Sequence, residues 1–155
     1  MTIAFRFAES SDIPLILQMN KELNKFTGTV ADTPRIERGL QKFIGRPEYG
    51  AIWLICEGDT AVGYMVFAWG FSLEFGGRDA FLDEFYIQEA YRGQGIGKYA
   101  LNFAAEQCQL FEIQAIHLEV ERDNFGAQEF YKRLGFAQRD RYYLMSKYLD
   151  MHLPD

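Results

Sequence analysis

The chain has 155 residues and a mass of 18.0 kDa, the size of one domain with a substantial core. Its 48% hydrophobic and 25% charged residues exclude a disordered protein, and no apolar run approaches the length that a membrane span needs. The formal net charge of −6 argues against generic nucleic-acid binding, which requires a basic surface, and is compatible with cationic substrates.

The N-terminal part of the chain predicts one strand and two helices. Residues 2–8 alternate apolar and polar side chains, as a half-buried strand does. Pro14 then lies early in a helix that runs to about Phe26 and carries an apolar stripe. A polar break separates it from a shorter helix that we expect to start at Thr33 and end near Ile44.

Three strands are expected next. Residues 51–57 and 60–69 are apolar runs joined by Gly58-Asp59, which is a strong hairpin signal. A turn region at 70–79 then leads to a third strand at 80–87.

The C-terminal half predicts helices alternating with strands. Residues 96–110 carry an apolar helical face, and residues 115–121 alternate as a half-buried strand. Asn124 is placed to cap a further helix, which Gly135 is expected to stop. Residues 141–149 then predict a last strand.

The order β-α-α-β-β-β-α-β-α-β predicts a single α/β (α+β) domain with a mixed sheet over residues 1–155. The N-terminus has no basic stretch followed by a long apolar one, so we expect no secretory signal. Cys56 and Cys108 are too few and too far apart for a disulfide framework. These features together predict a cytoplasmic, reduced protein.

Three glycines, Gly93, Gly95 and Gly97, lie at alternate positions between Arg92 and Lys98, directly before a predicted helix. Glycine costs roughly 0.5–1 kcal/mol relative to alanine in regular structure, so the cluster indicates a backbone that must turn sharply. Successive N–H groups at a helix start bind anions. We therefore expect this loop to hold a phosphate-bearing ligand.

Two common phosphate-binding motifs fit the loop poorly. A P-loop requires Ser or Thr after the Gly-Lys pair, where this chain has Tyr99. The dinucleotide fingerprint is formally met by Gly95, Gly97 and Ala100. That fingerprint should follow its strand directly, however, and residues 88–94 intervene. A nicotinamide-dependent oxidoreductase stays open as the weaker alternative.

The segment RGQGIG, residues 92–97, matches the pattern R/Q-x-x-G-x-G/A, and here the chain resembles the GNAT acetyltransferase superfamily. The strand LDEFYI before it, the strand ending in LEVERDN and the pattern A-x-x-F-Y-x-x-x-G-F at 127–136 follow in that family's order. The resemblance covers most of the chain from Ile52 onward. Residues 12–26 resemble, more weakly, the first helix of the diamine acetyltransferase branch. The resemblance to the GNAT superfamily implies a GNAT-like domain with a mixed, mostly antiparallel twisted sheet flanked by helices.

The resemblance implies acetyl-CoA as cosubstrate, with its pyrophosphate held by N–H groups of the loop. The residues expected to contact acetyl-CoA are Phe85, Tyr86, Ile87, Arg92, Gly93, Gln94, Gly95, Ile96, Gly97, Lys98, Asn124 and Ala127.

It also implies direct transfer of acetyl to a primary amine in a ternary complex, without a covalent acyl-enzyme. Asp83 and Glu84 are the candidate bases, acting directly or through water. Neighbours in a regular strand point to opposite faces, so only one should face the reaction, and the resemblance favours Asp83. A backbone N–H near Phe85 or Tyr86, beside a bulge, would bind the developing oxyanion, and Tyr131 would protonate the leaving thiolate.

The acceptor is expected to be a small amine such as a polyamine, a diamino acid or an aminoglycoside. The regions that recognise the acceptor in the resembling family carry acids here, with aromatic residues nearby in sequence: Glu22, Asp32, Glu37, Glu74, Tyr49, Trp53, Trp69 and Phe75. For any one of them, a surface acid or a core aromatic is the commoner role. A peptide N-terminus or lysine, and a non-catalytic acyl-CoA-binding module, stay open as alternatives. We expect no nucleic-acid or membrane partner, and homodimerisation only as a family expectation.

No metal site is expected, because His117 and His152 are far apart and neither cysteine has a matching partner. No serine lies in a nucleophile-elbow motif. We interpret His117 and Glu119 as surface residues.

Overall fold

The computed structural model of the chain describes residues 2–149. The described part of the chain folds as two compact units, residues 2–119 and 120–149. Within the described part, the strands of the first unit are β1 (Ile3–Phe7), β2 (Gly50–Glu57), β3 (Thr60–Ser72), β4 (Gly77–Ile87) and β5 (Ile113–His117). Its α-helices are α1 (Ile13–Thr27), α2 (Thr33–Phe43) and α3 (Ile96–Leu110), with short 3-10 turns at Ser10–Asp12 and Glu89–Tyr91. The second unit carries helix α4 (Phe125–Arg133).

The predicted element order is confirmed from the first strand to the last helix, and so is the α/β class. The last strand, expected at residues 141–149, is wrong. That segment is rich in residues that favour strands, but a strand forms only against a partner, and this segment pairs with no strand in the described chain. Its Tyr143 and Met145 side chains are 81% and 90% exposed.

The five strands form one sheet in the order β1-β2-β3-β4-β5. The first three pairings are antiparallel and the β4–β5 pairing is parallel, so the mixed, mostly antiparallel sheet is confirmed. The parallel pairing joins β4 to β5 only from Arg78 to Phe81. β5 ends at His117, opposite Phe81, and past that point no strand of the described chain pairs with this side of β4.

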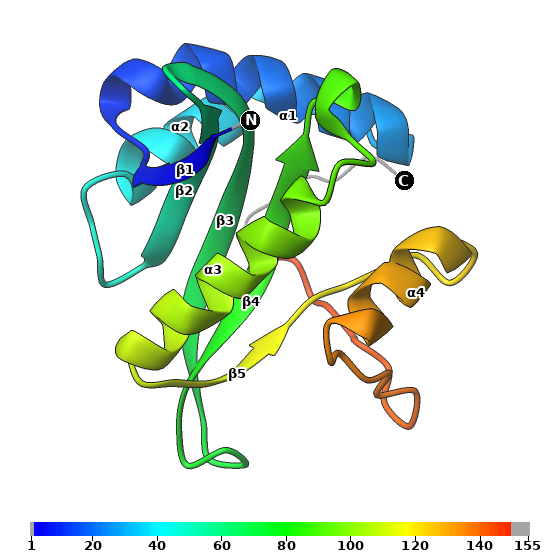
Figure 1. Cartoon of the computed structure of the whole chain (residues 1–155). Helices are drawn as coiled ribbons and strands as arrows, with labels where there is room; N and C mark the ends of the chain where they lie inside the picture. The colour runs from blue at the N-terminus through cyan, green and yellow to red at the C-terminus, as the bar shows by residue number, and fades with distance from the viewer. Residues whose placement is uncertain (1, 150–155) are drawn as a thin grey trace. The chain divides into compact units, whose positions relative to one another are not determined.

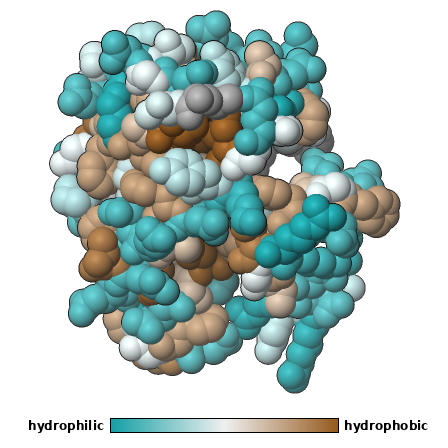
Figure 2. Space-filling view, viewed as in Figure 1, coloured by the Kyte–Doolittle hydropathy of each residue, from teal (hydrophilic) through white to brown (hydrophobic). Residues whose placement is uncertain are grey.

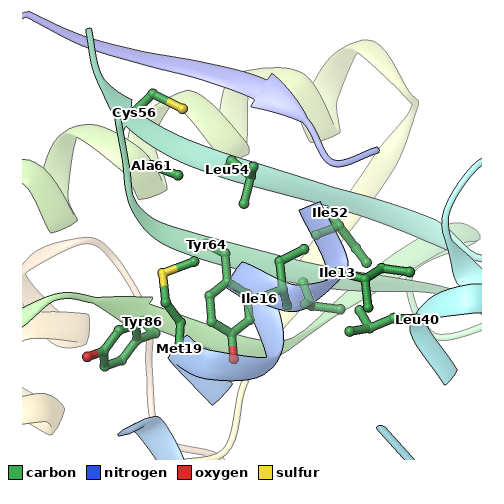
Figure 3. Packing of buried hydrophobic residues seen from close by; sticks show 11 residues of the cluster. Ile13, Ile16, Met19, Leu40, Ile52, Leu54, Cys56, Ala61, Tyr64 and Tyr86 are labelled. Atoms are coloured by element: carbon green, nitrogen blue, oxygen red, sulfur yellow. The ribbon is translucent and has the colours of Figure 1, made fainter. Parts of the chain in front are cut away.

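Helices α1 and α2 cover one face of this sheet and α3 covers the other (Figure 1). On the first face, residues of α1 such as Ile16 and Met19 pack with Leu54, Tyr64 and Tyr86 of the strands (Figure 3). This packing follows from the apolar stripe of α1, which repeats at helical spacing. It fixes α1 directly above the strands that carry the candidate site.

On the second face the core is aromatic. Trp53 is 2% exposed, and its ring meets Phe67 at 5.7 Å and Phe103 of α3 at 5.6 Å, both edge to face. On the outer surface of this side, hydrophobic residues show as separate brown patches between hydrophilic side chains (Figure 2). The packing of Trp53 against Phe103 holds α3, and with it the loop that precedes α3, against the sheet.

Candidate active site

The glycine loop connects β4 to α3. Gly93 has φ 74° and Gly95 has φ 82°, both in the left-handed region that other residues enter only at a cost of roughly 1–2 kcal/mol. The loop therefore needs glycine at both positions, as its sequence pattern predicts. Gln94 bonds back to the Ala90 carbonyl through its Nε2 at 3.2 Å, and Ile96, 4% exposed, anchors the start of the helix.

The first turn of α3 has backbone N–H groups with no partner in the described chain. The first helical bond runs from the Tyr99 N–H to the Gly95 carbonyl at 3.1 Å, which leaves the N–H groups of Ile96, Gly97 and Lys98. Gly95, the N-cap, has no side chain that could accept from them. Unpaired donors at a helix start, together with the helix dipole, suit an anion.

Two further features lie beside this helix start. The Lys98 side chain is exposed. A shallow hollow of about 420 Å³ adjoins the loop, lined by Thr2, Ile3, Gln94, Gly95, Ile96 and Tyr99. Positive charge and open space therefore both adjoin the unpaired N–H groups.

Arg92 lies between the end of β4 and the end of α1. Its Nε donates to the Ile87 carbonyl at 2.8 Å. Its guanidinium lies 5.3 Å from the centre of the Phe26 ring and 5.4 Å from that of Tyr86. Arg92 is thus fixed at the base of the loop, where it joins the loop to helix α1.

The backbone of β4 presents polar groups on its open side. The Gln88 N–H donates to Val62 of β3 at 2.8 Å, and Tyr86 lies opposite Tyr64 of β3. The N–H and C=O groups of successive residues point to alternate sides of an antiparallel strand. Those of Tyr86 therefore face β3, while those of Phe85 and Ile87 face the opposite side of β4, beyond the end of β5. Of the two N–H groups predicted as oxyanion donors, the Phe85 N–H is the one with this orientation.

A β-bulge in β4 lies at the candidate acids. Glu84 pairs with Val66 and Leu82 pairs with Phe67, so Asp83 is an extra residue between them. The bulge interrupts the strict alternation on which the choice of a single acid rested. It also exposes the Asp83 side chain to solvent.

Glu84 belongs to a polar network between the sheet and α1. The Tyr64 hydroxyl donates to Glu84 Oε1 at 2.7 Å, and Asn20 Nδ2 donates to Oε1 at 3.0 Å and to Oε2 at 3.1 Å. Asn24 Nδ2 in turn donates to the Asn20 side-chain oxygen at 2.9 Å. Asn20 is 1% exposed and Tyr64 is fully buried.

The sequence prediction missed this network. The available signal was Asn20, because it continues the apolar stripe of α1 one residue after Met19 and so lies on the buried face. A buried polar side chain requires partners, and the partners here are on other elements. Nothing in the local sequence singles out Tyr64 or Asn24.

The surroundings of the two acids set their protonation. Burial raises the pKa of Glu84 above its usual 4.5, the bonds from Tyr64 and Asn20 oppose that rise, and the charge of Asp83 adds to it. Partial desolvation raises the pKa of Asp83. Burial, chiefly, raises the pKa of Tyr64 far out of the physiological range, so its hydroxyl stays a donor.

The second unit holds the remaining predicted residues. Asn124 caps α4, since its Oδ1 accepts the Ala127 N–H at 3.2 Å, and Gly135, with φ 95°, follows the helix end; both predictions are confirmed. The Tyr131 ring contacts Phe130 at 5.2 Å and Phe136 at 5.7 Å. Burial raises the pKa of Tyr131 above 10, so the phenol keeps its proton at neutral pH.

Several of the acids and aromatics weighed for the acceptor site have structural roles. Trp53 lies in the core of the α3 face and is 2% exposed, so it is the core aromatic that the commoner account expects. Asp32 caps α2 by accepting the Arg35 N–H at 3.1 Å, and Trp69 Nε1 donates to the Pro47 carbonyl at 3.1 Å. Glu22 and Glu37 are exposed.

His117 is not the surface residue that the sequence predicts. It is half-buried at the point where β5 leaves β4, and its Nε2 lies 3.2 Å from Asp79 Oδ2. His117 is the last residue of β5 and pairs with Phe81 of β4, so its side chain lies near Asp79 on the same strand. Glu119 is exposed, as predicted.

Residues 2–149 contain no cluster of His, Cys, Asp or Glu that could hold a metal ion, and His152 lies outside the described residues. Cys56 and Cys108 are buried, free thiols. No helix in the described range is long and apolar enough to cross a bilayer.

The comparison with family models decides the family. Residues 16–136, from α1 through the residue that follows Gly135, match the model described as the acetyltransferase (GNAT) family. The chain belongs to that family. The resemblance read from RGQGIG is thereby confirmed at the level of the GNAT family.

Curated proteins similar in sequence to this GNAT protein include named acetyltransferases. The spermine/spermidine N(1)-acetyltransferase of Bacillus subtilis is 33% identical over 94 residues, covering 57% of this chain and 59% of that enzyme. The chain spans about half the length of the curated relatives it matches.

Two solved structures have the same fold as this GNAT protein. The integron cassette protein HFX_CASS3 from the mobile metagenome of Cole Harbour Salt Marsh has a TM-score of 0.82 at 30% identity, over 95% of this chain and 91% of that one. A predicted acetyltransferase from Clostridium acetobutylicum, solved with acetyl-CoA, has a TM-score of 0.79 at 18% identity over 94% and 96%. At that identity the second likeness is one of fold.

Proposed function

We propose that this GNAT protein is an acetyl-CoA-dependent N-acetyltransferase that acts on a primary amine of a small molecule. The observation that carries the proposal is the unpaired N–H turn at the start of α3, which the loop after Ile87 connects to the strand that carries Asp83 and Glu84. An anion-binding turn suits the diphosphate of an acyl thioester carrier, and acids on the preceding strand suit the deprotonation of an amine.

The loop fits the diphosphate of coenzyme A. Three N–H groups, from Ile96, Gly97 and Lys98, lack partners in the described chain, and the left-handed glycines before them leave space for an anion to approach. Asn124 and Ala127, predicted to contact the cofactor, would act from the second unit. Acetyl-CoA supplies the activated acetyl thioester, and the Clostridium acetobutylicum relative was solved with that molecule.

The acceptor must lose a proton before it can attack the thioester. A primary ammonium with a pKa near 10.4 is neutral in only about one part in a thousand at pH 7.4, a deficit of roughly 4 kcal/mol. The acids of β4, Asp83 and Glu84, attract the cation and accept its proton. The Phe85 N–H, directed to the open side of β4, is our candidate donor to the developing oxyanion, and Tyr131 is our candidate acid for the thiolate.

A small cationic amine is the acceptor class that we propose, in the manner of the diamine branch. The support is the net charge of −6, the exposed acids Glu22 and Glu37, and the similarity to a spermine/spermidine acetyltransferase. A homodimer and a cytoplasmic location stay predictions.

The test is thiol release. Purified protein is mixed with acetyl-CoA and a panel of polyamines, diamino acids, aminoglycosides and short peptides, while isothermal titration measures coenzyme A binding. We expect saturable binding and thiol release with at least one small amine. Release only with peptides would favour a peptide acetyltransferase, and binding without release would favour a non-catalytic module. A protein that neither binds coenzyme A nor releases thiol would contradict the proposal.

The loop makes a second expectation. Gly95→Ala should raise the Kd for coenzyme A about tenfold, because a side chain at φ 82° costs roughly 1–2 kcal/mol and shifts the N–H groups that follow. Gly58→Ala is the matched control: Gly58 also has a positive φ, 57°, but lies in the β2–β3 hairpin. Equal Kd values for the two variants by isothermal titration would show that the loop does not hold the diphosphate.

A further inference from the structure

The Glu84 carboxylate is held from two sides by buried donors. Oε1 accepts two hydrogen bonds, from Tyr64 and from Asn20, whereas Oε2 accepts only the longer bond from Asn20. A carboxylate has about four lone-pair positions, two on each oxygen. Oε1 is therefore filled, and Oε2 keeps an acceptor position for a proton from outside the network.

We propose that Asn20 and Tyr64 are positioning residues that fix Glu84 as the base, with Oε2 as the atom that takes the proton. The inference rests on the proposed function. The ammonium N–H bond breaks, its proton goes to Oε2 and its electron pair stays on nitrogen. The nitrogen then bonds to the acetyl carbon, and the carbonyl electron pair moves onto the oxygen. That pair re-forms the carbonyl as the carbon–sulfur bond breaks. The nitrogen gives up its extra proton to solvent and the leaving thiolate takes one, so the products are a neutral amide and a free thiol.

The orientation of Asn20 is fixed by its own neighbour. Asn24 Nδ2 donates to both the backbone carbonyl and the side-chain oxygen of Asn20, at 3.0 and 2.9 Å. The opposite amide orientation would place the Asn20 oxygen against a carboxylate and its NH2 group against that of Asn24, losing both sets of bonds. Asn24, one helical turn along α1, thus keeps the Asn20 NH2 group directed at Glu84.

Asp83, by contrast, has no hydrogen-bond partner in the described part of the chain and lies on the exposed bulge. A flexible side chain loses rotamer entropy when it is fixed, and Glu84 has already lost that freedom in the folded protein. A base already held in place requires less reorganisation when substrate arrives. We therefore assign the base to Glu84, and to Asp83 the attraction of the cation.

Within residues 2–149, three groups act on the charge of Glu84. Tyr64 faces it from β3, Asn20 from α1 and Asp83 from β4 itself. The first two stabilise the ionised carboxylate, and the third opposes ionisation. Removing either donor must therefore raise the pKa of Glu84. A base works only when ionised, so the acid limb of the rate profile must move to higher pH with it.

The test compares Tyr64→Phe, Asn20→Ala and wild type with two readouts. Titration of 13C-labelled glutamate carboxyls by NMR, with Glu84 assigned by Glu84→Gln, follows the carboxylate in the protein without substrates. The pH profile of kcat/KM follows thiol release. We expect both midpoints to rise by about one pH unit in each variant, with activity recovering above the shifted limb.

Tyr64→Phe keeps the volume of the ring, so this variant still tests the proposal if Asn20→Ala fails to fold. Tyr143→Phe is the control, because it removes a phenol hydroxyl from a side chain that is 81% exposed and does not bond Glu84; its acid limb should stay in place.

Three outcomes would overturn the proposal: unmoved NMR midpoints, a raised carboxyl pKa with an unmoved acid limb, or a rate loss equal at every pH. The absence of thiol release from wild type would instead contradict the proposed function, whatever the carboxyl titration shows.

Discussion

We expect Glu84→Gln to lower kcat/KM for acetyl transfer by about 10²- to 10⁴-fold, the usual contribution of a general base. The amide keeps the size of the carboxylate and can still accept the Tyr64 hydroxyl bond, so the loss reports proton transfer rather than packing. Burial raises the pKa of Glu84 above 4.5, so the acid limb of the wild-type profile should lie above that value and should disappear in the variant. Steady-state kinetics across pH measure both effects.

Asp83→Asn is the matched comparison, since it makes the same chemical change one residue away. It removes the exposed charge on the bulge, so we expect a raised KM for cationic acceptors and a much smaller loss of kcat. The reverse pattern, with kcat lost in Asp83→Asn and kept in Glu84→Gln, would assign the base to Asp83. That is the residue which the sequence resemblance favours.

Tyr131→Phe should lower kcat by about 10²- to 10³-fold and leave the Kd for coenzyme A nearly unchanged. The phenol is the only group that the change removes, while the ring contacts with Phe130 and Phe136 persist. Since burial raises the pKa of Tyr131 above 10, no alkaline limb from this residue should appear below pH 10.

Tyr143→Phe is the control for Tyr131, because Tyr143 lies in the same unit and is 81% exposed. Its kinetics should match those of wild type. Single-turnover rates and isothermal titration separate the two quantities. Equal losses of kcat and of coenzyme A affinity in Tyr131→Phe would make Tyr131 a structural residue and leave the thiolate without the acid we propose.

The loop was predictable because its signal is local. Positive φ angles at Gly93 and Gly95 require glycine, and the helix start follows at once, so the spacing of a few residues encodes both the turn and the unpaired N–H groups. The cap at Asn124 was predictable for the same reason, because the cap bond spans three residues.

The arrangement of the acids could not be predicted in this way. Glu84 meets Tyr64 across 20 residues and Asn20 across 64, and only the packing of α1 on the sheet brings them together. The bulge at Asp83 likewise depends on register between β3 and β4, which alternation within one strand cannot reveal. Trp53 marks another limit, since the sequence pattern does not distinguish an aromatic residue in a core from one on a binding surface, and only the structure places it in the core.

The burial of both cysteines bears on how the acetyl group can travel. Exchange of a thioester onto a protein requires an ionised, reachable sulfur. Burial raises the pKa of Cys56 above 9.0 and that of Cys108 to about 11, so both sulfurs stay protonated and enclosed. Any acetyl adduct trapped on this protein by mass spectrometry should therefore be found on an amine or a hydroxyl, and Cys→Ala variants should turn over as wild type does.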